Sequence, residues 1–344
     1  MQWFYDLSKF EIEKSFQNLG LKSFVSTQLS AWVLNKNVNN HNKWLNISKK
    51  NRELLINNFS FSLNKIIGKD IDENGTRKFL IELDDGNKIE SVLIKERSHF
   101  TFCISTQVGC ALKCSFCATG HMGLKRDLST GEIISQILLL KRDLGKYEGK
   151  INLVFMGMGE PLLNYKNLRK ALYLITDEKG IGISPKRITV STAGILKNLK
   201  RLEDDFPNVK ISFSLNGSDN EQRGKIMPIS KKEHIDDILA YFRSKRRKHR
   251  ITFEYVLIDG INDDREDAKK VSSMLRGIPS KINIIPYNPN DFSNYKTPSK
   301  VKVDEFTEFL SEMGHTVMVR WSKGKNIKSA CGQLAGGHGN YNVS

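Results

Sequence analysis

From about residue 100 onward, the sequence alternates between short apolar runs and longer amphipathic segments. Six runs have the length and composition of strands, at 100–106, 151–157, 187–193, 209–215, 251–258 and 281–287. Strands that alternate with helices form parallel βαβ units, so the chain is predicted to be an α/β protein. Periodicity leaves open whether the sheet curves into a partial barrel or lies flat as a doubly wound sheet. In both cases a site is expected at the C-terminal ends of the strands.

The regions before and after this alternation differ in character. Residues 1–65 are predicted to be helical, because Ser8 and Glu11 form a capping box and Gly20 follows as a C-terminal cap. A second capping box, Ser129 with Glu132, predicts the start of a helix further along the chain. The predicted division of the chain is a helical unit, a β-hairpin turning at Asp84-Asp85-Gly86, a core, and a Gly-rich tail, at residues 1–65, 66–97, 98–330 and 331–344 respectively.

Charge and composition narrow the partners and the compartment. The 344 residues carry a net charge of +16, which suits a nucleic acid, although a generally basic proteome would give the same balance. The basic run 243–250 is a candidate for phosphate contacts or a solvated helix end, and 46–52 is a second candidate. No apolar run of membrane-spanning length and no signal-peptide pattern is present, so we expect a cytoplasmic protein that does not bind membranes.

Four of the five cysteines fall in the segment CISTQVGCALKCSFC, at Cys103, Cys110, Cys114 and Cys117, and the fifth is Cys331. In the cytoplasm such thiols point to metal binding or catalysis rather than to structural disulfides. Three thiols on one loop after a strand suit a four-iron cluster that keeps one iron open. One alternative is a zinc site with His121 as the fourth ligand. The other is that the cysteines are clustered by chance.

Other polar and glycine residues follow the next strands. In FMGMGEP, Gly157 and Gly159 can leave backbone groups open to a ligand, and Glu160 can face an ammonium. Ser191 and Ser214 end the following two strands, where their hydroxyls can reach the same ligand. Without a ligand, the two glycines could simply form a tight turn, and the two serines could be ordinary residues at strand ends.

The sequence resembles the dual-specificity RNA adenine methyltransferases of the RlmN/Cfr family of radical S-adenosylmethionine (SAM) enzymes. The resemblance rests on the C-x3-C-x2-C loop and on stretches in the family's order: CISTQVGCALKCSFCATG, FMGMGEPLLN, ITVSTAGI, MPI, INIIPYNP and ACGQLAG. It implies a partial (β/α)6 radical SAM barrel with an N-terminal helical accessory domain that binds RNA. It also implies a [4Fe-4S] cluster on Cys110, Cys114 and Cys117.

The resemblance further implies the remaining site residues. SAM would lie against Gly159, Glu160, Ser191, Ser214, Leu215, Asn216 and Asn288. Cys331 matches the family's methyl-carrying cysteine, Cys103 its resolving cysteine and Glu90 its proton acceptor. The family usually has histidine where this chain has Asn216, which puts that contact in doubt.

The chemistry implied is methylation of C2 of an adenosine in 23S rRNA and in the anticodon loop of some tRNAs. C2 lacks a nucleophilic lone pair, so a radical route is needed. It uses two SAM molecules per turnover, one to methylate Cys331 and one for the radical. Release of the RNA would leave a Cys103–Cys331 disulfide. A monomer and an electron donor such as flavodoxin or ferredoxin are expected by the same resemblance.

Two alternatives remain at this point. A C8-methylating relative that confers antibiotic resistance shares the plan of five cysteines, although INIIPYNP and FMGMGEPLLN are closer to the C2 enzymes. A zinc-stabilised RNA-binding protein without enzymatic activity would be colourless and would have no use for Cys331.

Overall fold

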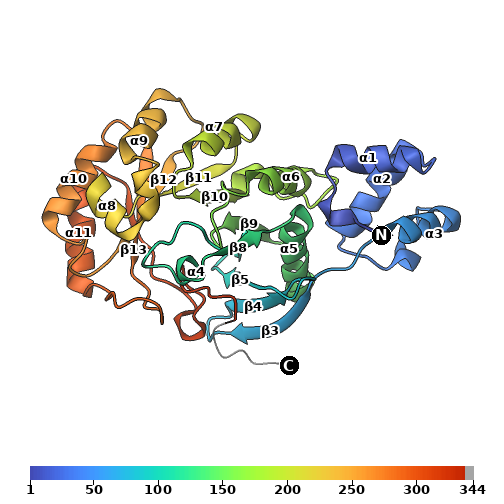
Figure 1. Ribbon diagram of the computed structural model, residues 1–344, viewed down its shortest axis with the longest axis horizontal. Coiled ribbons are helices and arrows are strands. Elements are labelled where there is room, and N and C mark those ends of the chain that lie inside the picture. Colours follow the sequence, from blue (N-terminus) through green and yellow to red (C-terminus); the bar gives the residue numbers. More distant parts are fainter. Residues whose placement is uncertain (338–344) are drawn as a thin grey trace.

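The computed structural model describes residues 1–337, and its centre is one ten-stranded sheet (Figure 1). Neighbouring strands follow the order β14-β13-β12-β11-β10-β9-β6-β5-β4-β3. The parallel strands are β6 (His99–Cys103), β9 (Lys150–Phe155), β10 (Ile188–Thr192), β11 (Lys210–Ser214), β12 (Ile251–Leu257), β13 (Ser280–Pro286) and β14 (Val317–Val319). All six predicted strands are therefore formed, with a short seventh after them.

Helices connect each parallel strand to the next. They are α5 (Thr130–Leu144), α6 (Tyr165–Thr176), α7 (Leu196–Asp205), α8 (Asn220–Ile226), α9 (Ile235–Ser244), α10 (Arg265–Leu275) and α11 (Lys300–Glu312). The strand order never reverses, whereas a doubly wound sheet reverses at its switch point. Successive right-handed crossovers therefore place the helices on one outer face, as Figure 1 shows for α7, α9, α10 and α11. The fold is an open, partial β/α barrel.

An antiparallel extension continues the sheet beyond β6. It consists of β3 (Lys65–Ile71), β4 (Arg77–Glu82) and β5 (Lys88–Lys95). The predicted hairpin is β4–β5, closed by a hydrogen bond from the Leu83 amide to the Asn87 carbonyl at 2.8 Å. The third strand, β3, was not predicted.

The N-terminal helices lie beside the barrel (Figure 1). This region contains β1 (Gln2–Trp3), η1 (Phe4–Asp6), α1 (Lys9–Asn18), α2 (Ser23–Ser30), η2 (Ala31–Asn35), η3 (His41–Lys43), α3 (Lys49–Asn58) and β2 (Phe59–Ser60). The predicted capping box of α1 is present, and Gly20 follows it with a φ of +69°. The region is tied to the barrel because Asp6 accepts a hydrogen bond from the Gly131 amide at 2.6 Å, and the buried cores of both parts are continuous. None of the helices within residues 1–337 is both long and apolar enough to cross a membrane.

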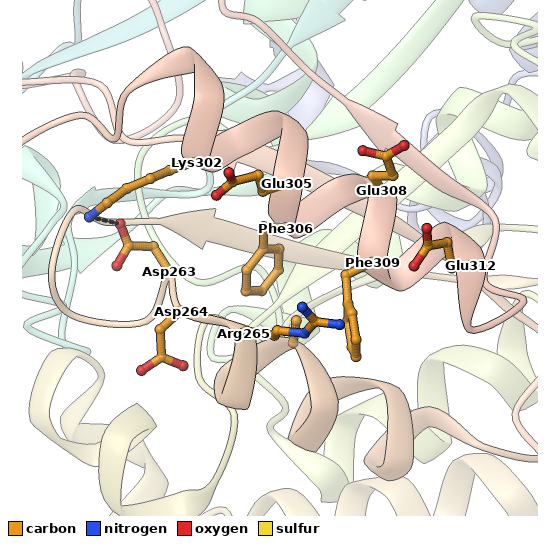
Figure 2. A pocket seen from close by; sticks show the side chains of 10 residues that line it. Asp263, Asp264, Arg265, Lys302, Glu305, Phe306, Glu308, Phe309 and Glu312 are labelled. Atoms are coloured by element: carbon orange, nitrogen blue, oxygen red, sulfur yellow. Dashed lines mark hydrogen bonds and ion pairs between the residues drawn. The ribbon is translucent and has the colours of Figure 1, made fainter.

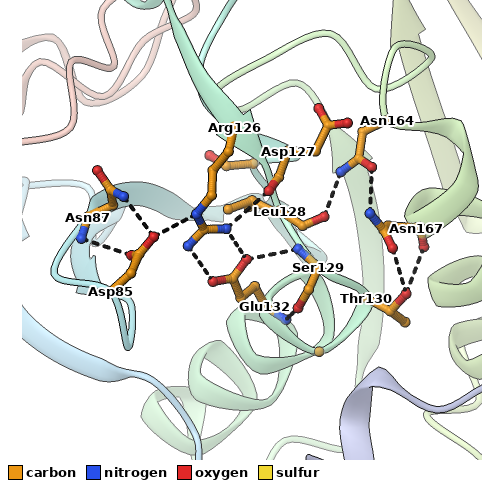
Figure 3. Close-up of polar contacts among 12 residues, drawn as sticks. Asp85, Asn87, Arg126, Asp127, Leu128, Ser129, Thr130, Glu132, Asn164 and Asn167 are labelled. Carbon is orange, nitrogen blue, oxygen red and sulfur yellow. Dashed lines mark hydrogen bonds and ion pairs between the residues drawn. The ribbon is translucent and has the colours of Figure 1, made fainter.

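A small ribbon anchors the cysteine loop to the rest of the molecule. It consists of β7 (Gln107–Gly109) and β8 (Leu124–Asp127), with the short helix α4 (Ala118–His121) between them. Figure 3 shows that Arg126 binds Asp85 at the hairpin tip (2.7 Å) and Glu132 of the predicted α5 capping box (2.8 Å). Further short elements are η4 (Pro185–Arg187), η5 (Pro228–Lys231) and η6 (Lys325–Ile327). The predicted tail, 331–344, is described only as far as residue 337, and its last seven positions lie outside the described residues.

Candidate active site

The three clustered cysteines lie on the loop that joins β7 to α4, close to the C-terminal end of β6. Cys110 and Cys114 are buried and Cys117 is half-buried. Burial raises the pKa of all three thiols, to about 12 for Cys110, and each thiol also interacts with its neighbours in the loop. Because cluster ligands are thiolates, binding at this loop would release protons.

The three thiols are not arranged as ligands of a single metal ion. Within residues 1–337, no three His, Cys, Asp or Glu side chains are grouped as one metal ion requires. A four-iron cluster binds each cysteine through a different iron and holds the sulfurs further apart, so this finding does not bear on a cluster. His121, the candidate fourth zinc ligand, instead lies 3.0 Å from the Ser115 carbonyl and stacks on Phe292.

The loop after β9 lies directly against the cysteine loop. Glu160 is buried and accepts hydrogen bonds from the Leu162 amide (3.0 Å) and the Ala193 amide (2.8 Å). Each carboxylate oxygen keeps acceptor capacity for a further donor. Burial raises the pKa of this carboxyl, which lies near Cys110 and Cys114.

The glycines of this loop are required for close packing, and their predicted exposure of backbone groups to a ligand stays a prediction. A Cβ on Gly157 would lie 2.6 Å from the Ser105 hydroxyl, and one on Gly159 would lie 2.5 Å from Gln107. Gly159 also has a φ of +95°. These glycines therefore allow the loop to pack against the segment that follows β6, and this packing places Glu160.

The ends of β10 and β11 present polar residues to the inside of the barrel. Ser191 pairs with Ser212, and Ser214 pairs with Glu254 of β12, so these side chains share one face. Ser191 and Ser214 are half-buried and Leu215 is fully buried.

Asn216, a predicted SAM contact, has a side chain that bonds to two other segments of the protein. Its φ is +56°, a conformation that asparagine tolerates better than most residues. The amide oxygen accepts from the Val256 amide at 2.9 Å, and the amide nitrogen lies 3.2 Å from the Met227 sulfur. The side chain is thus engaged within the protein, and a cofactor contact would have to use the spare capacity of the amide or the backbone.

The tail that carries Cys331 is held against the cysteine loop. The Ala118 amide donates to the Gly332 carbonyl at 2.8 Å, and the Thr119 hydroxyl donates to the Leu334 carbonyl at 2.7 Å. Asn288, predicted as a SAM contact, donates to the Cys331 carbonyl at 3.2 Å. The structure therefore joins three predicted parts of the site that are far apart in sequence.

Cys103 and Cys331 line one pocket of about 340 Å³. Cys103 is buried and Cys331 is exposed. Burial raises the pKa of the Cys103 thiol to about 12, and the nearby Cys331 acts in the same direction. Arg320, Trp321 and Lys323 line the same pocket. All five cysteines are free thiols, so no Cys103–Cys331 disulfide is present.

Glu90 contacts the tail rather than this pocket. Its carboxylate accepts from the Ala335 amide at 2.6 Å and the Gly336 amide at 3.1 Å, and the Lys78 ammonium lies 3.7 Å away. The residue is 3% exposed, and burial raises the pKa of its carboxyl while Lys78 opposes that shift.

Three polar residues of the site were missed by sequence reasoning. Glu254 is buried, and one of its carboxylate oxygens has no hydrogen-bond partner among the described residues. Arg320 interacts electrostatically with Cys331, Glu254 and Cys103. Arg223 is fully buried beside Cys114 and Glu160. Glu254 could have been found from the sequence, because it is a charged residue within an apolar strand. No sequence signal pointed to Arg320 or Arg223.

Another hollow, of about 540 Å³, lies between α10 and α11 on the outside of the barrel (Figure 2). Acidic side chains surround it, and Lys302 binds Asp263 at its edge at 3.0 Å. It contains none of the predicted site residues.

The basic run 243–250 serves the fold in part. Arg247 donates to the Glu203 carboxylate at 2.6 Å, with side-chain exposures of 11% and 8% for the two residues. The run precedes β12, so it lies at the N-terminal ends of the strands, opposite the cysteines. Arg247 therefore has a structural role, and contact of this run with RNA stays a prediction.

The comparisons with known proteins agree with this geometry. The family model described as "Ribosomal RNA large subunit methyltransferase N-terminal domain" matches residues 4–60, and that of the "Radical SAM superfamily" matches residues 104–271. A protein of Thermotoga maritima named "Probable dual-specificity RNA methyltransferase RlmN" is 43% identical over 332 residues, 96% of each chain. An Aquifex aeolicus protein of the same name is 40% identical over 94% of each chain.

A solved structure extends the agreement to the fold. The crystal structure of a radical SAM methyltransferase from Sphaerobacter thermophilus superposes with a TM-score of 0.91 at 33% identity, over 97% of this chain and 99% of that one. The chain therefore belongs to the RlmN family of radical SAM RNA methyltransferases.

Proposed function

We propose that this protein methylates C2 of an adenosine in 23S rRNA and of the anticodon-loop adenosine in some tRNAs. The observation that carries the proposal is the joint placement of the Cys331 tail against both the three-thiol loop and Cys103. A cysteine that accepts a methyl group beside a cofactor and passes it to RNA needs both neighbours. The relatives' printed name supplies the RNA substrate.

Cys110, Cys114 and Cys117 would hold the [4Fe-4S] cluster, and the strand-end residues would hold SAM. The fit rests on the unpartnered carboxylate oxygen of Glu254 inside the barrel and on the spare acceptor capacity of Glu160. Gly159, Ser191, Ser214, Leu215, Asn216 and Asn288 complete the proposed SAM site. When bound, the cluster and two SAM molecules per turnover would supply the methyl group and the radical chemistry.

The two remaining cysteines would act in sequence. Cys331, exposed in the pocket, would lose its thiol proton and carry the methyl group. Once the radical chemistry has removed one hydrogen atom from this methyl group, its carbon would bond to the RNA base. Cys103, as a thiolate, would attack the Cys331 sulfur and break its bond to the carbon. The methylene carbon would keep the electron pair of that bond and take up a proton, which leaves a methyl group on RNA. The resulting Cys103–Cys331 disulfide would take two electrons from a thiol reductant before the next cycle.

We propose two roles for Glu90: taking the proton from the ring carbon and holding the tail. Glu90→Gln retains a carbonyl oxygen for the tail amides but loses the base. Cys331 methylation in this variant is therefore expected to persist, measured by intact-protein mass spectrometry, while RNA turnover falls by about 10²–10⁴-fold. Glu90→Ala is expected to impair both. Normal RNA turnover in Glu90→Gln would exclude the proton-transfer role.

The N-terminal region offers a better RNA surface than the run 243–250. Lys49 and Lys50 are exposed and stand in the first turn of α3, where the helix dipole disfavours positive charge. Positive charges that lower the stability of the helix are better explained by contact with phosphate than by a role in the fold. We propose that residues 1–65 form an accessory RNA-binding unit on this basis.

This surface gives a prediction with effects of opposite sign. Lys49→Glu with Lys50→Glu should stabilise α3 by about 0.3–1 kcal/mol for each residue, because the dipole then favours the charge. The same double variant should bind RNA more weakly and with a flatter salt dependence, because fewer counterions are released. Arg246→Glu with Lys248→Glu is the matched control at the far end of the barrel, and equal weakening by both pairs would refute the assignment.

The function is tested by anaerobic reconstitution with iron and sulfide, followed by mass spectrometry of treated rRNA and tRNA. We expect a brown protein with about four irons per chain and 2-methyladenosine as the product. 8-Methyladenosine would instead identify the resistance-type chemistry. We also propose a cytoplasmic monomer served by a low-potential donor such as flavodoxin or ferredoxin.

A further inference from the structure

Arg223 is a fully buried arginine at the centre of the candidate site. It lies on α8 with 0% of its surface exposed and stacks over the Phe213 ring at 5.2 Å. A buried guanidinium is costly unless its donors and its charge are both satisfied. Neither α8 nor the MPI motif that follows it gave any sign of this role.

The donors of Arg223 are satisfied by the ends of two strands. Its Nη2 donates to the Ala193 carbonyl after β10 (2.7 Å) and to the Ser214 carbonyl at the end of β11 (3.0 Å). Its Nε donates to the Leu215 carbonyl at 3.0 Å, and Nη1 donates to the Ser230 hydroxyl at 2.6 Å. The rigid fork of the guanidinium thus fixes the segments that carry Ser214 and Leu215.

The charge of Arg223 is not satisfied by these bonds. All four of these acceptors are neutral, so no carboxylate is among them. Besides these bonds, Arg223 interacts electrostatically with Cys114 and, less strongly, with Glu160 and Glu233. Burial lowers the pKa of Arg223. A guanidinium nevertheless stays protonated in proteins, so the side chain is a cation at neutral pH.

We propose that Arg223 is a positioning and charge-balancing residue of the cofactor site: it aligns the strand ends for SAM and supplies the buried positive charge that faces the cluster at Cys114. This inference rests on the proposed function. A cluster on three thiolates is net negative, and a one-electron donor adds one further negative charge without breaking a bond. A nearby buried cation stabilises that reduced state and raises the reduction potential.

The test uses the whole reconstituted protein in three variants. Arg223→Gln removes the charge, and Arg223→Lys keeps the charge but loses the fork. Arg247→Gln is the matched control, because Arg247 is also partly buried, stacks on Phe242 and binds backbone carbonyls, but at the opposite end of the barrel. Iron content, the reduced fraction in a potential titration without SAM, and SAM affinity by equilibrium dialysis are measured for each.

In Arg223→Gln we expect the ratio of reduced to oxidised cluster at a fixed potential to fall about tenfold, which corresponds to about 59 mV. Arg223→Lys should keep a near-native potential with weaker SAM binding, and Arg247→Gln should change neither. Native potential and native SAM affinity in Arg223→Gln would overturn the inference. If Arg223→Gln is insoluble, Arg223→Lys decides, because native SAM affinity there excludes the positioning role. Absence of iron from the wild-type protein would count against the proposed function instead.

Discussion

Cys114→Ala is expected to reduce the iron content from about four per chain to near zero and to abolish methylation of RNA. The thiol is buried and interacts with Cys110, Cys117 and Arg223, so its loss removes one of the three proposed ligands from the centre of the loop. The reconstituted variant should be colourless, as judged by iron analysis and by visible absorption. A variant that keeps a full, brown cluster would show that the three-thiol assignment is wrong.

Cys331→Ala is the control for this experiment, because it removes a thiol that lies outside the proposed ligand set. It should bind as much iron as the wild-type protein and still produce no methylated RNA. The pair separates loss of the cluster from loss of the methyl carrier. Equal loss of iron in both variants would indicate that the Cys331 tail is a structural part of the cluster site, through the Ala118–Gly332 hydrogen bond.

Features that depend on local sequence were predictable. Each of the six strands was found from its apolar run, and the capping boxes at Ser8 and Ser129 were found because both partners lie within one helical turn. The loop of three cysteines was found because its three thiols lie within eight residues of one another. Periodicity could not distinguish a partial barrel from a doubly wound sheet, because the difference depends on which strands become neighbours.

Features that depend on distant contacts were not predictable from single residues. Gly157 and Gly159 are required by the approach of another segment, and Asn216 is engaged with two other elements. Glu90 was selected only by resemblance, and its contact with the tail depends on residues more than two hundred positions away. The structural role of Arg247 in the run 243–250 was not predicted, because its partner, Glu203, lies on another helix.

Cys103→Ala is expected to trap the protein on its RNA. In the proposed cycle, the RNA becomes bonded to the carbon on Cys331 before Cys103 acts. Removal of Cys103 therefore leaves the first methyl transfer and the joining step intact and blocks only release. The variant should accumulate a covalent protein–RNA adduct, seen as a shifted band on a denaturing gel that disappears after RNase digestion.

Cys331→Ala should give neither adduct nor methylated RNA, and the double variant should behave like Cys331→Ala alone. The structure makes this comparison informative, because both sulfurs line one pocket and Cys103 is otherwise an ordinary buried residue of β6. If Cys103 has only a structural role, its replacement should lower stability without trapping RNA. Cys103→Ser tests this with a smaller change in side-chain volume. Release of methylated adenosine at the normal rate by Cys103→Ala would reject the two-cysteine mechanism for this protein, since a missing resolving thiol leaves the adduct no other route in this pocket.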